Sequence, residues 1–164
     1  MNAGELEKKA NWIRSQTLEM IVSAGKGHIG GAFSSADILV VLHYGGILRL
    51  DASDPNWNER DRFILSKGHS CVALYAILAD LGFFPVSELD SLCRGGSMLG
   101  GYPDRNIPGI EADTGSLGHG LAIAAGLALG GRLDKKNYMT VALIGDGECQ
   151  EGSVWEAAMF AAHH

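Results

Sequence analysis

Apolar and polar positions alternate along the chain in blocks that predict helices separated by short strands. Over residues 5–24 apolar side chains return every three or four positions, which predicts an amphipathic helix ending at Gly25. Residues 63–65 and 138–144 are continuous apolar runs instead. Such runs are typical of buried strands, and the longer one predicts a central parallel strand that is covered on both faces.

Further helices are predicted between and after these strands. Residues 72–81 form an apolar segment closed by Gly82, and residues 117–129 are rich in alanine and other small residues that allow close packing against a sheet. An apolar segment at residues 38–42 predicts a helix buried on all sides. Three pairs have the spacing of a capping box at a helix start: Ser34 and Asp37, Ser87 and Asp90, and Ser153 and Glu156.

The order of these elements predicts the fold class. Helices that alternate with short apolar strands favour an α/β fold: a three-layer domain with a mainly parallel sheet and helices on both faces. The length of 164 residues fits one domain over residues 1–164. Ligands of such folds bind at the carboxyl ends of the strands.

The composition and charge of the chain argue against several classes of function. The chain is 46% hydrophobic with a formal net charge of −6 and no basic stripe, so we expect no nucleic-acid partner. The apolar run at residues 117–129 is too short to cross a membrane, and no signal peptide is visible. The three cysteines are widely spaced, which favours reduced thiols and a cytoplasmic location. An acidic chain that binds phosphate needs a mediator, and a divalent cation is the usual one.

The 23 glycines fall in clusters that predict ligand-binding loops. The run GKGHIGG at residues 25–31 is predicted to be neither helix nor strand. In IGDGE at residues 144–148, Asp146 could hold a cation near a phosphate, although an isolated triplet of this kind is more often a plain turn. The run DTGSLGHG at residues 113–120 suits a diphosphate or an aromatic ring, and equally an ordinary helix start.

Three histidines lie in separate glycine-rich loops. His28, His69 and His119 are therefore candidates for proton transfer or phosphate binding near neutral pH. His43 lies instead on a predicted apolar helix, so we interpret it as structural.

In this order the segments resemble the amino-terminal, diphosphate-binding module of transketolases, and most of all those made as two separate chains. Each motif is modest alone, but the set covers almost the whole chain. The matching segments are residues 27–31, 61–69, 108–112, 114–120 and 145–148, followed by Glu151.

The resemblance implies a thiamine diphosphate site with Mg²⁺. Asp146 would bind the metal that bridges to the cofactor, and the backbone of Gly147 would contact the diphosphate. His69 would lie at the diphosphate side. Gly115 and Leu117 would lie against the aminopyrimidine ring.

The resemblance also implies an activity: transfer of a two-carbon ketol unit from a ketose phosphate to an aldose phosphate. His28 would face the substrate, with His69 as a second catalytic histidine. Tyr102 stands where the family usually has a histidine that contacts the donor. A tyrosine, with a pKa of about 10, donates a hydrogen bond but is a poor proton shuttle at neutral pH.

Family members assemble as oligomers, so the resemblance implies a partner: a pyrimidine-binding module or carboxyl-terminal subunit, in a homo- or hetero-oligomer. Glu151 resembles a glutamate of the family's subunit interface. The family takes further metal ligands from beyond the last helix seen here, so we expect a partial domain that is inactive alone. Two alternatives stay open: a related thiamine-diphosphate transferase with a non-standard substrate, and a non-catalytic assembly module.

Overall fold

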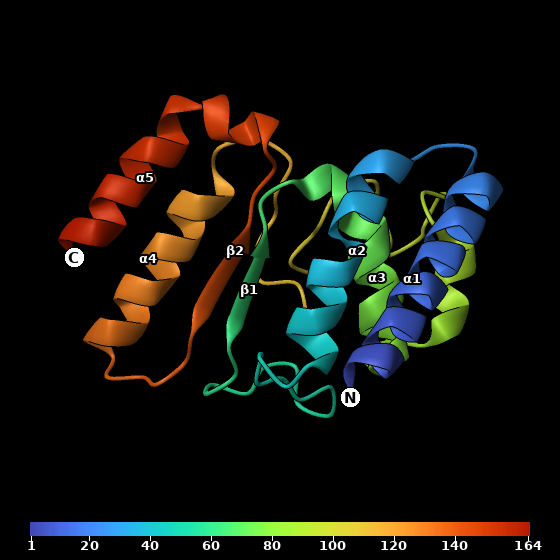
Figure 1. The fold of residues 1–164 in the computed structure, drawn as a ribbon, viewed down its shortest axis with the longest axis horizontal. Helices are drawn as coiled ribbons and strands as arrows, with labels where there is room; N and C mark the ends of the chain where they lie inside the picture. The colour runs from blue at the N-terminus through green and yellow to red at the C-terminus, as the bar shows by residue number, and fades with distance from the viewer.

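The computed structural model describes all residues 1–164 and has an α/β fold (Figure 1). Five α-helices accompany two short strands. In chain order the elements are α1 (Ala3–Ala24), α2 (Ile29–Tyr44), β1 (Arg62–Leu65), α3 (Cys71–Asp80), α4 (Gly120–Leu133), β2 (Thr140–Leu143) and α5 (Gly152–His163). Three short 3₁₀ turns, η1 (Gly68–Ser70), η2 (Val86–Ser91) and η3 (Gly147–Gln150), interrupt the loops.

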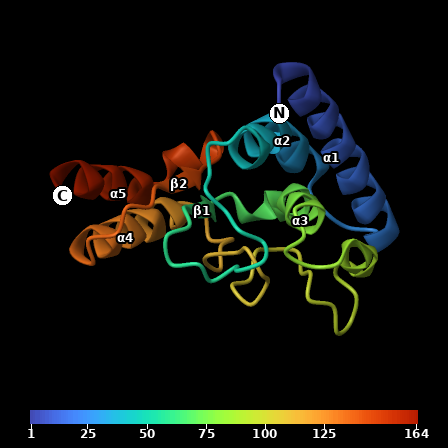
Figure 2. The same cartoon turned by 90° about the horizontal axis from the view of Figure 1, so that it is seen from below.

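The two strands pair in parallel and separate two groups of helices. Helices α1, α2 and α3 pack on one another, whereas α4 packs on both strands and α5 packs on α4. Figure 2 shows α4 and α5 together on one side of the strands and α1 to α3 on the other. The predicted α/β class with a parallel sheet is confirmed, with a sheet of two strands. None of the helices combines the length and hydropathy needed to span a membrane.

Helix α1 follows its predicted pattern closely. It begins at Ala3, two residues before the prediction, because Asn2 caps it. The Asn2 side chain accepts a hydrogen bond from the Glu5 backbone at 3.0 Å, and the Glu5 carboxylate accepts one from the Asn2 backbone at 2.7 Å. The helix ends at Gly25, whose left-handed conformation (φ 67°) suits glycine.

The prediction for the next segment is wrong in two respects. Helix α2 begins at Ile29, inside the glycine-rich run, so Ser34 and Asp37 lie within the helix and do not cap it. The Ser34 hydroxyl instead donates to the Gly31 carbonyl, 3.1 Å away. The reason is tertiary: packing on α1 and α3 stabilises a glycine-containing helical turn that propensity alone disfavours.

The prediction that this helix is buried on all sides is also wrong. Leu39 and Val40 are buried, but Ile38 is 50% exposed and Val41 is 40% exposed. Helices α1 and α3 cover one side of α2, which leaves the other side uncovered.

The two remaining capping boxes do not form either. Ser87 and Asp90 lie in the 3₁₀ turn η2, which follows Pro85 and has no side-chain cap. Helix α5 follows Glu151 without a side-chain cap. The Ser153 hydroxyl, predicted to pair with Glu156, donates to the Gly118 carbonyl at 3.0 Å. That long-range partner replaces the one expected at the helix start.

Strand β2 is not the central, doubly covered strand that the sequence predicts. It spans only Thr140–Leu143, every residue is partly exposed, and β1 is its single neighbour. The predicted close packing of α4 on the sheet is confirmed, although α4 begins at Gly120, three residues later than expected. A methyl group at Gly131 would lie 2.6 Å from the Tyr138 ring, so a larger residue there would force the ring to move.

Candidate functional site

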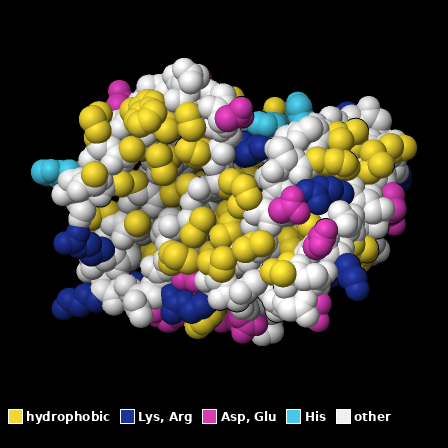
Figure 3. Space-filling view, in the orientation of Figure 1, with side chains coloured by type: hydrophobic (Ala, Val, Ile, Leu, Met, Phe, Trp, Pro, Cys, Tyr) yellow, Lys and Arg dark blue, Asp and Glu magenta, His cyan; other side chains and the backbone are white.

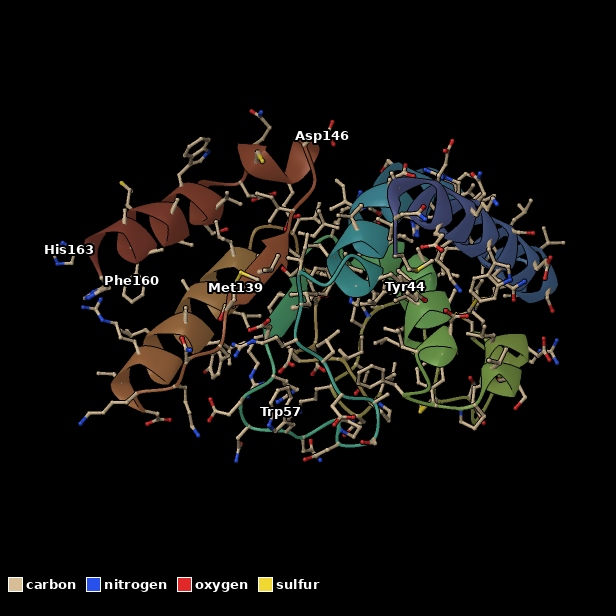
Figure 4. All side chains as sticks on the ribbon, turned by 60° about the horizontal axis from the view of Figure 1, so that its bottom comes forward. Tyr44, Trp57, Met139, Asp146, Phe160 and His163 are labelled. Atoms are coloured by element: carbon tan, nitrogen blue, oxygen red, sulfur yellow. The ribbon has the colours of Figure 1, made fainter.

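The carboxyl ends of the two strands bring the predicted loops to one edge of the sheet. Leu65 of β1 is in register with Leu143 of β2, and the strands are parallel. The loops that follow them therefore leave the sheet side by side (Figure 1). Figure 4 shows Asp146 at the turn just beyond β2. This is the edge at which open parallel sheets bind ligands.

A cavity of about 360 Å³ is lined by residues from several loops near this edge. His28, His69 and Tyr102 all line it, together with Cys93. The rings of His28 and His69 meet edge to face, with their centroids 5.5 Å apart. The fold thus brings together three side chains that are far apart in sequence.

His69 lies in a tightly packed position. A methyl group at Gly31 would lie 2.7 Å from His69 Cδ2, so glycine at that position makes room for the imidazole ring. Partial burial lowers the pKa of His69, and the positive charge of Lys67 and the nearby His28 lower it further. His69 is therefore predominantly neutral at pH 7, with one nitrogen that donates and one that accepts a hydrogen bond.

Tyr102 forms another wall of the cavity. Its ring packs on Gly115, where a methyl group would lie 2.8 Å from the ring at a backbone φ of 151°. The Tyr75 hydroxyl donates to the Tyr102 carbonyl at 2.7 Å, which holds the backbone in place. The Tyr102 side chain remains 50% exposed and so can contact a ligand.

The loop before α4 is bound to the end of β1. The Thr114 hydroxyl donates to the Leu65 carbonyl at 2.7 Å. A methyl group at Gly68 would lie 2.9 Å from the Thr114 backbone, so the two loops are in direct backbone contact. Leu117, three residues further on, is 39% exposed.

The loop after β2 combines one free acid with one buried acid. Asp146 is exposed and its carboxylate makes no hydrogen bond within the chain; the space around a methyl group at Gly147 is open. Glu148 is only 2% exposed. Its carboxylate accepts hydrogen bonds from the backbones of Gly118 and Gly145 and from the Ser66 hydroxyl.

A family model confirms the resemblance that these loops carry. The model described as transketolase, thiamine diphosphate binding domain, matches residues 6–164. The chain belongs to this family.

Among curated proteins, the chain is 47% identical to the 6-deoxy-6-sulfo-D-fructose transketolase subunit SqwG of Clostridium sp. (strain MSTE9), over 96% of this chain and 57% of that protein. It is 42% identical to an apulose-4-phosphate transketolase subunit of Phocaeicola vulgatus, over 97% of this chain and 56% of that protein. The chain therefore spans just over half the length of these relatives.

Solved structures of the transketolase family have the same fold. The transketolase from Leishmania mexicana matches with a TM-score of 0.88 and 33% identity, over 96% of this chain and 25% of that chain. The transketolase from Campylobacter jejuni subsp. jejuni matches with a TM-score of 0.89 and 33% identity, over 96% of this chain and 26% of that one.

The structure divides the residues implied by the transketolase resemblance into two groups. Those around the cavity are His28, His69 and Tyr102, with Gly115 packed behind the tyrosine. Those at exposed positions outside the cavity wall are Leu117, Asp146 and Gly147. His119, the third loop histidine, is exposed and does not line the cavity.

His43 is structural, as its place on an apolar helix predicts. It is 9% exposed, its Nδ1 lies 2.8 Å from the Leu39 carbonyl, and burial lowers its pKa to about 4. Sequence reasoning missed Cys93 and Glu148. The sequence places Glu148 in the same glycine-rich loop as Asp146, but nothing in that loop distinguishes the buried acid from the exposed one.

Proposed function

We propose that this chain is the thiamine-diphosphate-binding part of a transketolase that moves two-carbon ketol units between sugar phosphates together with a second subunit. The observation that carries the proposal is the joint placement of His28, His69 and Tyr102 around one cavity at the carboxyl edge of the sheet. Two similar proteins are named as transketolase subunits, which supports a partner chain here.

In this proposal Asp146 is the protein's ligand to Mg²⁺. Its exposed carboxylate offers the hard oxygen that Mg²⁺ prefers, and Gly147 leaves open space for a diphosphate. No group of three or more potential ligand side chains surrounds it. Asp146 would thus be one ligand of a cation whose other ligands come from the diphosphate and from groups beyond the last helix seen here. The cofactor, when bound, supplies the nucleophilic carbon that carries the ketol unit.

We assign the two cavity histidines to hydrogen bonding and proton transfer. Neutral His69 can donate to a diphosphate oxygen from one ring nitrogen. His28 is exposed at the start of α2 and faces the cavity, which places it to exchange protons with substrate oxygens. Gly115 and Leu117 are assigned to the aminopyrimidine side of the cofactor.

Tyr102 favours a second version of the proposal, in which the donor differs from that of transketolases with histidine at this position. A tyrosine hydroxyl can hold a donor oxygen but exchanges protons poorly at neutral pH. The two subunits named above have distinct sugar substrates by name. Product analysis with a panel of ketose donors, including these sugars, tests which donor is used.

We further propose that the chain needs its partner for activity, in a homo- or hetero-oligomer, and that the sheet has helices on both faces in the complete protein. The partly exposed β2 supports an additional neighbour. Ketol transfer by the isolated chain would contradict this part of the proposal.

Binding of thiamine diphosphate to the complete protein with its partner, measured by calorimetry at several Mg²⁺ concentrations, tests the proposal. Asp146→Ala is expected to weaken cofactor binding at least about tenfold, because it removes a metal ligand. Asp134→Ala is the matched control, since Asp134 is also exposed but lies at the far end of α4. Equal cofactor affinity in wild type and Asp146→Ala would contradict the metal assignment, and a wild type that binds no cofactor would contradict the function.

A further inference from the structure

Glu148 is a buried acid in the loop that follows β2. It lies in the turn η3 (Gly147–Gln150), two residues after Asp146, and is 2% exposed. It has no ion pair with Lys, Arg or His. A buried carboxylate without a cation is costly unless hydrogen bonds replace its lost water.

Three donors from three separate loops satisfy this carboxylate. The backbone N–H of Gly118 donates to Oε1 at 2.9 Å, and the Ser66 hydroxyl donates to the same oxygen. The backbone N–H of Gly145 donates to Oε2 at 2.9 Å. Both oxygens therefore act as hydrogen-bond acceptors.

Each of these donors lies next to a segment that carries residues assigned to the cofactor in the proposed function. Ser66 immediately precedes the segment that carries His69. Gly118 follows the segment from Gly115 to Leu117, and Gly145 directly precedes Asp146. One side chain thus connects the loop after β1, the loop before α4 and the loop after β2.

Other hydrogen bonds at this edge connect fewer segments. Thr114 joins its loop to the end of β1, and Ser153 joins α5 to Gly118. Neither reaches the backbone that presents Asp146. Glu148 hydrogen-bonds the backbone directly before Asp146 and, at the same time, the two other loops.

We propose that Glu148 is a positioning residue that sets the relative placement of these three loops, and so prepares Asp146 to hold a metal against the cofactor diphosphate. This inference rests on the function proposed above. A purely structural buried acid would contribute to folding stability without affecting how much Mg²⁺ the cofactor needs.

Glu148→Gln separates these two roles because it keeps the size and shape of the side chain. Glutamine offers one acceptor oxygen and one donor NH₂ group. Its oxygen can serve Ser66 and Gly118, but its NH₂ group then faces the donor N–H of Gly145. The reverse orientation leaves the same mismatch at Gly118. Either way a donor meets a donor, so we expect the loops around Glu148, including the turn that carries Asp146, to shift relative to one another.

The test measures thiamine diphosphate binding to the holoenzyme with its second subunit, as a function of Mg²⁺. Glu148→Gln is expected to raise the Mg²⁺ concentration for half-saturation roughly tenfold, as befits one buried donor left unsatisfied. At saturating cofactor and metal, kcat should stay within about threefold of wild type. Ser153→Ala is the matched control: it loosens the same Gly118 segment without touching Gly145, and half-saturation should stay within about twofold.

Half-saturation of Glu148→Gln at the wild-type Mg²⁺ concentration would overturn the positioning role. If Glu148→Gln does not fold, Glu148→Asp decides, because its shorter side chain cannot reach all three donors; wild-type half-saturation in that variant would overturn the proposal equally. A wild-type holoenzyme that binds no cofactor would refute the proposed function itself, which is a distinct outcome.

Discussion

The helices α1 to α3 and the segment formed by α4, β2 and α5 differ sharply in how they bury apolar side chains. The main hydrophobic cluster of 25 buried residues lies entirely between Ala10 and Ile107. Nine of the ten residues of α3 are buried, whereas β2 has none and α5 has two. Figure 3 shows hydrophobic side chains gathered on the surface over α4 and α5.

The residues of the candidate site therefore lie on two parts of the molecule that differ in how many of their side chains are buried. The large exposed side chains of the second segment include Leu133 at 74%, Met159 at 66% and Trp155 at 62%. His28, His69 and Tyr102 lie on the well-packed part, while Asp146 and Gly147 lie on the exposed one. Asp146, the proposed metal ligand, therefore lies in the part of the molecule that has few buried residues.

The largest expected effect is a cavity in the buried part. Ile77→Ala removes a side chain that is 0% exposed in α3, and should lower the free energy of unfolding by about 3 kcal/mol. Met159→Ala in α5 is the matched control, with an expected change within about 0.5 kcal/mol. Urea unfolding followed by circular dichroism measures both. Comparable losses in the two variants would contradict the contrast between the two parts.

An intermediate effect is expected at the junction of the two parts. Asp61 is 1% exposed and accepts hydrogen bonds from the backbones of Arg49 at 2.8 Å and Met139 at 2.7 Å. It also pairs with the Arg49 guanidinium at 2.9 Å. Asp61→Ala leaves these donors unsatisfied and should cost about 2 kcal/mol of unfolding free energy.

Lys136→Ala is the control for the Asp61 variant. Lys136 pairs with Glu59 at 2.8 Å close to the same junction, but both side chains are partly exposed. Such a surface pair contributes little to stability, because water screens the two charges. The urea midpoint of Lys136→Ala should therefore stay close to that of wild type. If both variants unfolded at the same urea concentration, the hydrogen bonds of Asp61 would not stabilise the junction between the two parts.

The smallest effect is a loss of stability in acid. Burial by itself opposes ionisation of Asp61, but hydrogen bonds from Arg49 and the Met139 backbone outweigh it and lower the pKa. A lowered folded-state pKa contributes stability that is present above the unfolded value of about 3.9 and is lost as the pH falls towards the folded value. The unfolding free energy should therefore drop below about pH 4 in wild type, and less steeply in Asp61→Ala. Parallel pH profiles would contradict this assignment.

Much of the site was predictable because its residues lie in recognisable motifs. His28, His69 and Asp146 stand in glycine-rich segments whose local chemistry points to phosphate or proton transfer. Strand β1 and helices α1 and α3 were also predictable, since their apolar periodicity and terminal glycines agree with their final environment. In these elements the conformation that the local sequence favours is also the one that the tertiary packing stabilises.

Other features were not predictable from local patterns. Ser34, Ser87 and Ser153 have capping-box spacing, yet none caps a helix. Ser153 makes a long-range hydrogen bond instead. The same hydroxyl satisfies either kind of partner, and only the neighbours available in the fold decide between them.

The sequence by itself determined the α/β class, the order of the main elements and the identity of the loop residues, because hydrophobic periodicity and glycine clusters are local properties of the chain. Tertiary structure alone decided that His28 meets His69, that Tyr102 packs on Gly115 and that Glu148 is buried. These contacts join residues up to 82 positions apart, as between Ser66 and Glu148. Which donors reach a buried carboxylate depends on how the parallel strands align their loops, and no local pattern records that alignment.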